Sequence, residues 1–282
     1  MSLPNAVLIS GASTGIGAAC ALRLAEMGWQ VYAGIRREED GRRLEEQSSG
    51  KVTSVQLDVT RPKDISAVAE QLHAQLKSCG LAALVNNAGI AISGPLEEVA
   101  MDDWRQQFDV NFFGAVALTK ACLPMLREAR GRIVNVSSVS GRVASPFLSP
   151  YAASKFALEA VSDALRVELR PQGIRVALVE PGAVATPIWD KSGSASRERE
   201  AAYSKDFQAL YGKPMAGFRK MAEDTGRRAM PVEVVVRAVV HALTAKRPRT
   251  RYLLGREARL AAFVHRLLPD SWWDALMARH LK

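Results

Sequence analysis

The stretch VLISGASTGIGAACALRLAEMGW, residues 7–29, decides how the rest of the chain is interpreted. A short β-branched apolar run leads into three glycines, Gly11, Gly15 and Gly17, and then into apolar residues at helical spacing. A strand, a glycine loop and the start of a helix together form a cradle for a phosphate group. The same letters also satisfy the G-x-S-x-G pattern of a hydrolase nucleophile elbow, with Ser13 as the nucleophile.

The position of this loop separates the two interpretations. A nucleophile elbow lies late in its sheet and is followed by an acid and a histidine, whereas this loop follows the first expected strand. A dinucleotide-binding loop belongs after the first strand, where glycines allow a tight turn and a close approach of pyrophosphate. The sequence therefore favours phosphate binding, with Ser13 as a cradle residue. A plain tight turn and the elbow remain the alternatives.

Composition limits the class of protein. The chain has 282 residues, of which 48% are hydrophobic and 24% charged, as is typical of one soluble α/β enzyme domain. Three scattered cysteines without metal-ligand spacing predict no metal site and suit a reducing cytosol. The N-terminus lacks the features of a signal peptide, and no apolar run is expected to span a membrane. We therefore expect a cytoplasmic protein.

The net charge of +9 comes largely from KRPRTRYLLGREAR, residues 246–259. A solvated basic face is the expected explanation. Anionic membrane lipid and a phosphorylated substrate are alternatives. A nucleic acid partner is not expected, because no recognised binding motif accompanies the charge.

Apolar runs alternate with helical patterns along most of the chain. The expected strands are residues 6–10, 29–36, 52–59, 81–89, 131–138, 174–182 and 249–255. This alternation predicts right-handed crossovers and a single α/β domain, 1–282, with a doubly wound parallel sheet of the Rossmann type. Residues 187–230 are polar and weakly helical, which suggests a lid-like insertion over the substrate. Residues 256–282 are expected to form a C-terminal extension of two short helices broken at Pro269.

Five short motifs occur together and in order: SGASTGIG (10–17), LDVT (57–60), NNAG (86–89), SS (137–138) and YAASK (151–155). With this set, and with the G-x-x-x-G-x-G spacing of the first motif, the chain resembles the short-chain dehydrogenase/reductase family from about residue 5 to 190. Ser10 departs from the family, in which threonine is common, but it keeps a hydroxyl.

Tyr151 and Lys155 are one helical turn apart and share a helix face. A nearby ammonium is expected to lower the pKa of the tyrosine, which can then act as a general acid or base. A lone pair of this kind is usually a surface pair, but this one follows a strand end, where ligands of such sheets bind. The resemblance adds Ser138 and Asn111 to the catalytic set. It implies that Ser138 donates to the reacting oxygen, Lys155 also holds the nicotinamide ribose, and Asn111 orders a water linking Lys155 to solvent.

The second expected strand ends in VYAGIRR, residues 31–37. NAD-preferring relatives carry an acid at the position of Ile35, and here Arg36 follows it instead. A guanidinium suits a 2′-phosphate, so NADP(H) is expected to be preferred, with NAD(H) possible and a solvated Arg36 as the alternative. Arg37 is expected to share the phosphate. By resemblance, the other cofactor-binding residues are Gly11, Ser13, Thr14, Gly15, Ile16, Gly17, Asp58, Val59, Asn87, Ala88, Gly89, Tyr151, Lys155, Pro181, Gly182, Val184 and Thr186.

The resemblance implies an oxidoreductase that moves a hydride between nicotinamide and a secondary alcohol, ketone or aldehyde. VYAGIRR, YAASKFALEA, the long insertion and PRTRYLLG resemble the 17β-hydroxysteroid and retinol dehydrogenase branch, which suggests an apolar, steroid- or retinoid-like substrate. A 3-oxoacyl-type reductase and a non-catalytic dinucleotide sensor are the alternatives. Aromatic residues of the insertion and tail either line an apolar pocket or pack on the domain. They are Trp189, Tyr203, Phe207, Tyr211, Phe218, Trp272 and Trp273.

The resemblance also implies a homodimer, formed through helices around residues 110–126 and 151–165, with a tetramer possible unless the extended C-terminus blocks it. In the tail, one helical stripe consists of Leu260, Phe263, Val264 and Leu267. We expect this stripe to dock on the domain or to act in a lid, and a peripheral membrane contact is not expected.

Overall fold

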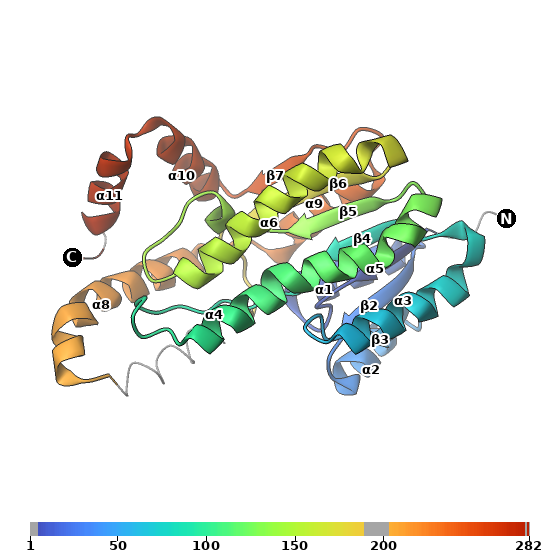
Figure 1. The fold of residues 1–282 in the computed structure, drawn as a ribbon, viewed down its shortest axis with the longest axis horizontal. Helices are drawn as coiled ribbons and strands as arrows, with labels where there is room; N and C mark the ends of the chain where they lie inside the picture. The colour runs from blue at the N-terminus through green and yellow to red at the C-terminus, as the bar shows by residue number, and fades with distance from the viewer. Residues whose placement is uncertain (1–4, 189–202, 280, 282) are drawn as a thin grey trace.

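The computed structural model describes residues 5–188, 203–279 and 281, and its centre is a parallel sheet of seven strands (Figure 1). The strands are β1 (Ala6–Ile9), β2 (Gln30–Ile35), β3 (Val52–Gln56), β4 (Ala83–Asn86), β5 (Arg132–Val136), β6 (Arg175–Pro181) and β7 (Arg251–Leu254). Their spatial order is β3-β2-β1-β4-β5-β6-β7, so the direction of winding reverses between β1 and β4. Ligands of open parallel sheets bind at such a reversal, outside the carboxyl ends of the strands.

Helices cover both faces of the sheet and explain why its central strands are mainly apolar. On one face, α1 (Gly15–Glu26) and α9 (Val232–Thr244) pack on one hydrophobic core, with α2 (Glu38–Gln47) beside β3. On the other, α3 (Pro62–Leu76), α5 (Gly114–Glu128) and α6 (Ser149–Glu168) lie side by side (Figure 1). Strands buried on both faces are near-continuous runs of Val, Ile and Leu, as in AVLI of β1. The predicted doubly wound α/β fold is confirmed.

The long helix expected over residues 101–130 is interrupted. It consists of α4 (Met101–Phe108), a π-helical turn (Asp109–Phe113) and α5. Such turns add a residue to one helical turn and are frequent at functional sites, and this one contains Asn111. The expectation that no segment resembles a membrane span is wrong by length and composition, because Met101–Glu128 is long and apolar enough. In the fold, α5 lies on the sheet with its Leu118 and Cys122 fully buried.

The insertion and the tail are more regular than the sequence indicates. The described part of the insertion is mostly one helix of 23 residues, α8 (Lys205–Arg227), which begins where the Ser204 hydroxyl accepts from the Phe207 amide. After β7 come α10 (Arg256–Leu267) and α11 (Asp270–Arg279). The chain then reaches back to α8, where a Cβ on Gly217 would lie 2.9 Å from the Leu281 backbone. The tail therefore contacts α8.

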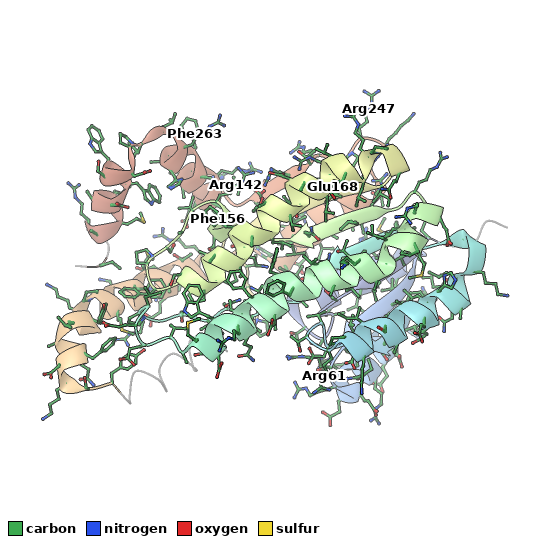
Figure 2. The ribbon with its side chains drawn as sticks, viewed as in Figure 1. Arg61, Arg142, Phe156, Glu168, Arg247 and Phe263 are labelled. Carbon is green, nitrogen blue, oxygen red and sulfur yellow. The ribbon has the colours of Figure 1, made fainter. Side chains whose placement is uncertain are left out.

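The expected docking of the tail stripe is wrong for most of its residues. Leu260, Phe263 and Leu267 are 62–64% exposed, and Phe263 projects from the outer side of α10 (Figure 2). Instead, α10 contacts the domain through the buried Ala258, which lies next to Gly182. A small side chain at this contact brings the backbone of α10 close to the end of β6 and leaves the larger apolar residues outside.

Candidate active site

A cavity of about 490 Å³ lies at the carboxyl edge of the sheet. Most of the residues expected to bind cofactor or act in catalysis line it. They are Gly11, Ser13, Thr14, Gly15, Ile16, Arg36, Asp58, Val59, Asn87, Ala88, Gly89, Ser138, Tyr151, Lys155, Pro181, Gly182, Val184 and Thr186. Gly17, Arg37 and Asn111 are not among its lining residues.

The glycine loop has the shape that a bound pyrophosphate requires. Gly11 and Gly15 have φ angles of +63° and +59°, a region that favours glycine. A Cβ on Gly17 would lie 2.4 Å from the Gly11 carbonyl oxygen and 2.5 Å from the Asn87 amide nitrogen, so this residue packs beneath the loop. Thr14 precedes α1 and makes no side-chain capping bond, which leaves the amides of the first turn available to an anion. These residues fit a dinucleotide.

Ser10 and Asn87 hold this loop against β4. The Ser10 hydroxyl accepts from the amides of Asn87 and Ala88, each at 3.1 Å. The Asn87 side chain donates to the carbonyls of Ser10 and Gly11 at 3.1 and 2.9 Å. The serine that departs from the family therefore still supplies the hydroxyl used here. In the part of the chain that the structure describes, no histidine lines the cavity, so the nucleophile interpretation of Ser13 finds no base there.

One arginine lies at the far end of the cavity. Ile35 is buried at the end of β2, and the exposed Arg36 lies at the rim beside Asp58. Burial alone would raise the pKa of Asp58, but hydrogen bonds from Thr60 and the positive charges of Arg36 and Arg61 hold that pKa below its ordinary value.

Two further arginines lie near this end: Arg37, which directly precedes α2, and Arg43 within α2. Both contact Asp40 of α2. The Nε of Arg37 lies 3.4 Å from an Asp40 carboxylate oxygen, so its guanidinium is directed toward α2. Arg43 donates to the Ser13 carbonyl at 2.7 Å and to Asp40 at 3.0 Å. Arg43 was not predicted, because no local motif marks an α2 residue as a neighbour of the glycine loop.

The catalytic side of the cavity is buried. Ser138 follows β5 and accepts from the Ser140 amide at 3.1 Å, which fixes its hydroxyl at the start of a short 3-10 turn. Tyr151 and Lys155 lie on α6, and the Lys155 ammonium donates to the Val136 carbonyl at 2.9 Å. Its Nζ is 5.8 Å from the centre of the Tyr151 ring. Three side chains capable of proton transfer and oxyanion stabilisation therefore meet on one wall of the cavity.

Burial dominates the ionisation of this pair. It raises the pKa of Tyr151, and a hydrogen bond with Ser138 opposes that shift. Burial also lowers the pKa of Lys155 to about 8, and the negative charge of Glu159 opposes that shift. The predicted lowering of the tyrosine pKa by Lys155 is therefore wrong for the protein alone, because burial of Tyr151 outweighs the opposing hydrogen bond.

Asn111 supports the cavity from behind. Its side-chain amide donates to the Ile90 carbonyl at 3.0 Å and to the Ser154 hydroxyl at 3.2 Å, and its oxygen accepts from the Ile90 amide at 2.9 Å. Gln107, one helical turn earlier and fully buried, also donates to the Ile90 carbonyl and accepts from the Ile92 amide, each at 2.8 Å. The sequence did not single out Gln107, although its i, i+4 spacing from Asn111 was the available signal.

The substrate side of the cavity is mainly apolar. Beyond the residues already named, its walls include Ile90, Ile92, Pro187 and Ile188. The described aromatic residues of the lid do not line this cavity but pack among themselves. Phe207 stacks on Tyr211 with ring centres 4.6 Å apart, and Phe147, from the loop before α6, lies 5.6 Å from Phe218.

The tail aromatics lie elsewhere. Trp273 is buried against His265 of α10, with ring centres 5.0 Å apart, and Trp272 is 67% exposed. Trp189 is outside the described residues. Of the two alternatives for these aromatic side chains, packing is therefore the one seen in the described part of the chain.

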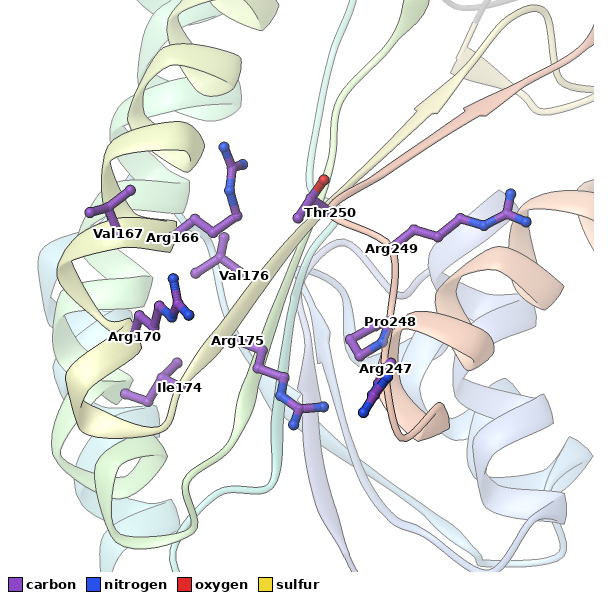
Figure 3. A pocket seen from close by; sticks show the side chains of 10 residues that line it. All are labelled: Arg166, Val167, Arg170, Ile174, Arg175, Val176, Arg247, Pro248, Arg249 and Thr250. Atoms are coloured by element: carbon purple, nitrogen blue, oxygen red, sulfur yellow. The ribbon is translucent and has the colours of Figure 1, made fainter.

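A second hollow, of about 450 Å³, lies at the opposite edge of the sheet, between the end of α6 and the start of β7 (Figure 3). Five arginines contribute to its lining: Arg166, Arg170, Arg175, Arg247 and Arg249. Their guanidinium groups do not converge, and Arg249 points away from Arg166 and Arg170 (Figure 3). This arrangement fits the expected solvated basic face, and the cavity at the carboxyl edge is the candidate active site.

Comparison with known proteins agrees with this geometry. The sequence model of a family described as short chain dehydrogenase matches residues 5–197. An NADPH-dependent 3-dehydrocapnine reductase from Ornithobacterium rhinotracheale is 34% identical over 98% of this chain and 96% of its own. Mouse retinol dehydrogenase 5 is 36% identical over 96% of this chain and 87% of its own. A Burkholderia cenocepacia short chain dehydrogenase solved with NADP superposes over the full length of both chains, with a TM-score of 0.73 and 26% identity.

The family match covers the strands, the glycine loop and all four predicted catalytic positions, and the matches to the relatives extend over nearly the whole chain. The fold, the cavity and the buried Ser138, Tyr151 and Lys155 are what such an enzyme requires. The chain therefore belongs to the short-chain dehydrogenase/reductase family, as an oxidoreductase that acts on CH–OH groups and resembles the retinol dehydrogenase branch.

Proposed function

We propose that this protein is an NADP(H)-preferring alcohol dehydrogenase or carbonyl reductase whose substrate is predominantly apolar. The observation that carries the cofactor preference is the pair at the end of β2. Ile35 offers no acceptor to a ribose 2′-hydroxyl, and the exposed guanidinium of Arg36 lies at the cavity rim, where it suits a 2′-phosphate. The NADP complex of one solved relative and the NADPH dependence of another support this choice.

The catalytic residues have separate tasks in this reaction. A bound nicotinamide supplies or accepts the hydride. In the reductive direction, the Tyr151 hydroxyl donates its proton to the carbonyl oxygen, and Ser138 donates a hydrogen bond to the same oxygen as negative charge develops there. Lys155 binds the ribose and, as an ammonium, stabilises negative charge on the tyrosine oxygen. In oxidation, the same groups work in reverse.

The substrate class follows from the walls beside the catalytic residues. Ile92, Val184, Pro187 and Ile188 line the cavity. In the loop between Ser138 and Tyr151, Phe147 packs against the rings of Tyr211 and Phe218 of α8. Phe147 has a φ of +60°, which a bulky residue adopts only when its surroundings compensate for the strain. We propose an apolar ketone, aldehyde or secondary alcohol as substrate, because these walls offer it few polar partners.

The test is a steady-state survey with the purified protein. NADPH and NADH are compared with ketones and aldehydes that differ in the length of an apolar chain and in added hydroxyl groups. We expect kcat/KM to be at least about tenfold higher with NADPH, and to rise with chain length and fall when a hydroxyl is added. Equal use of both cofactors would contradict the assigned role of Arg36, and indifference to polarity would contradict the apolar site.

We further propose that the protein is a homodimer. Phe113 of the π-helical turn before α5 is 55% exposed, and Phe156 and Val167 of α6 are 42% and 70% exposed. Such side chains favour a partner surface, and a two-fold axis would bring the same helices of two chains together. Light scattering at micromolar concentration should show a dimer, and a monomer would contradict the proposal.

A further inference from the structure

A cluster of charged side chains, of which Glu159 and Glu180 are buried, lies beside the catalytic helix α6. Arg251 of β7 donates to Glu159 and, at 2.6 Å, to both oxygens of Asp163, and these two acids lie one turn apart on α6. Arg251 also donates to Glu180 of β6 at 2.7 Å. Arg142, which follows the turn after Ser138, makes a two-bond contact with Glu180 at 2.6 and 3.0 Å. Four segments of the chain are therefore joined through charged groups.

The cluster lies next to the catalytic Lys155 and to residues that line the cavity. Glu159 is one helical turn beyond Lys155 on α6. Glu180 directly precedes Pro181 and Gly182, which line the cavity. Gly141 packs between the groups: a Cβ there would lie 2.9 Å from both the Glu159 Cγ and the Ser137 hydroxyl, and 3.2 Å from the Lys155 carbonyl.

Within this cluster, Glu159 is incompletely satisfied. Among the described residues, neither its Oε1 nor the Ser137 hydroxyl beside it has a hydrogen-bond partner of full geometry. Burial raises the pKa of Glu159 to about 7, the nearby Ser137 hydroxyl opposes this, the charge of Glu180 adds to it, and Arg251 opposes it. Asp163 differs, because its side chain is 46% exposed and its contacts with Arg166 and Arg251 outweigh burial and lower its pKa.

The direction in which Glu159 shifts the pKa of Lys155 follows from the charge of each group near neutral pH. Above about pH 7, Glu159 is a carboxylate, and its negative charge favours the Lys155 ammonium. Lys155 itself loses its proton near pH 8, and without Glu159 that loss would occur at lower pH. The charged and hydroxyl groups that face Glu159 are Lys155 and Asp163 on its own helix, Ser137 after β5, Glu180 on β6, Arg251 on β7 and, through Glu180, Arg142.

We propose that Glu159 is a positioning residue for the oxidoreductase reaction, whose buried carboxylate, fixed by Arg251, keeps Lys155 in the ammonium form that supports Tyr151. Glu159 does not touch the cavity and acts through Lys155. The proposal holds for whichever nicotinamide cofactor and alcohol the enzyme uses, so it does not depend on the preference for NADP(H) or on the apolar substrate.

Glu159→Gln tests this, because it removes the charge and keeps an oxygen that can accept from Arg251. In the reductive direction, the high pKa of Tyr151 leaves the loss of the Lys155 proton as the first cause of an alkaline fall in kcat/KM. We expect the variant to move that fall to lower pH by at least about half a unit, which lowers kcat/KM at pH 8 by at least about twofold. Glu159→Asp retains a charge and should restore most of the wild-type profile.

Asp163→Asn is the matched control. It removes a carboxylate from the same Arg251, but from an exposed position two turns away from Lys155. We expect it to lower thermal stability as Glu159→Gln does and to leave the pH profile in place. Equal shifts in both variants, or none in Glu159→Gln, would show that the cluster only ties β7 to α6 and would overturn the proposal.

A second measurement uses the wild-type protein and does not depend on a variant's folding. NMR titration of ¹³C-labelled lysine side chains, with the Lys155 signal identified by its absence in Lys155→Arg, should show Lys155 titrating near pH 8 with a further inflection near pH 7, where Glu159 ionises. A Lys155 signal without the inflection would contradict coupling between the two groups.

Discussion

The two ends of the cofactor cavity are built differently. At the catalytic end, Ser138, Tyr151, Lys155 and Asn111 are each at most 5% exposed, and their contacts involve β5, α6 and a π-helical turn. At the end where we propose that the adenosine ribose binds, Arg36 is exposed at the rim, and the nearby Arg43 of α2 donates to the Ser13 carbonyl. The side chains at the catalytic end are therefore held in place by packing in the core. Those at the other end are exposed, so they can be substituted without disturbing the core.

This difference predicts how substitutions act. Removing a buried group that meets the reacting atoms removes a step of the chemistry, and the packed surroundings offer no replacement. Removing an exposed group changes an affinity by the free energy of one or two charged hydrogen bonds, and water or a neighbour fills its place. Large effects on rate are therefore expected at one end and moderate effects on selectivity at the other.

The largest effect is expected for Tyr151→Phe. The change removes the proton donor and keeps the ring, so turnover should fall by about 10²–10⁴-fold while the cofactor still binds. Steady-state rates and a fluorescence titration with NADPH measure the two quantities. Tyr32→Phe is the control, because Tyr32 is equally buried but lies in β2 and accepts only from Gln30 in the described contacts. Retention of much of the wild-type rate in Tyr151→Phe would remove tyrosine from the mechanism.

Lys155→Ala should rank second and should affect two quantities at once. Lys155 is expected both to hold the ribose and to support Tyr151, so cofactor affinity should fall about ten- to hundredfold together with kcat. Isothermal titration of the cofactor separates affinity from rate. A loss of rate with unchanged affinity would mean that Lys155 does not contact the ribose.

The division between the two ends also explains what the sequence could and could not predict. The strands and the pairing of Tyr151 with Lys155 follow from local runs and short spacings, and Ser138 follows from the family resemblance, so all of these were predictable before any tertiary contact was known. The contact between Arg251 and Glu159 joins residues 92 positions apart, and Arg142 and Glu180 are 38 apart. Such pairs depend on strand order, which a local motif does not encode.

The tail and the π-helical turn are two further features that the local sequence pattern did not predict. The spacing of Leu260, Phe263 and Leu267 correctly predicted one apolar face on a helix. The spacing does not say what covers that face, and in the structure these residues are exposed. The π-helical turn at Asp109–Phe113 was also missed, because the run from 101 to 130 has helical spacing on both sides of it. Asn111 within the turn and Gln107 just before it bind the 90–92 loop, and these are again contacts that the local pattern does not encode.

A moderate effect is expected for Ile35→Asp combined with Arg36→Ala. The aspartate adds an acceptor for the ribose 2′-hydroxyl and repels a 2′-phosphate, and the alanine removes the phosphate's partner, so the preference should move from NADP toward NAD by tenfold or more, a factor of about ten for each charged hydrogen bond. The ratio of kcat/KM for the two cofactors with one ketone measures this. Arg61→Ala is the control, because Arg61 also lies beside Asp58 but does not line the cavity. An unchanged ratio in the double variant would place the adenosine ribose elsewhere.

The smallest effect is expected for Ser13→Ala, and it decides how the first motif is to be understood. If Ser13 contributes a hydroxyl to the phosphate cradle, its loss removes one hydrogen bond of about 0.5–1.5 kcal/mol, which weakens cofactor binding by about two- to tenfold and leaves kcat nearly unchanged. The backbone of the loop stays in place because the Ser13 carbonyl still accepts from Arg43 and because Asn87 still holds the Gly11 carbonyl. Cofactor titration and kcat in parallel separate the outcomes, with an ester panel lacking cofactor as the hydrolase assay. Complete loss of activity with normal cofactor binding, or ester hydrolysis that disappears in Ser13→Ala, would make Ser13 a nucleophile and this loop an active-site elbow.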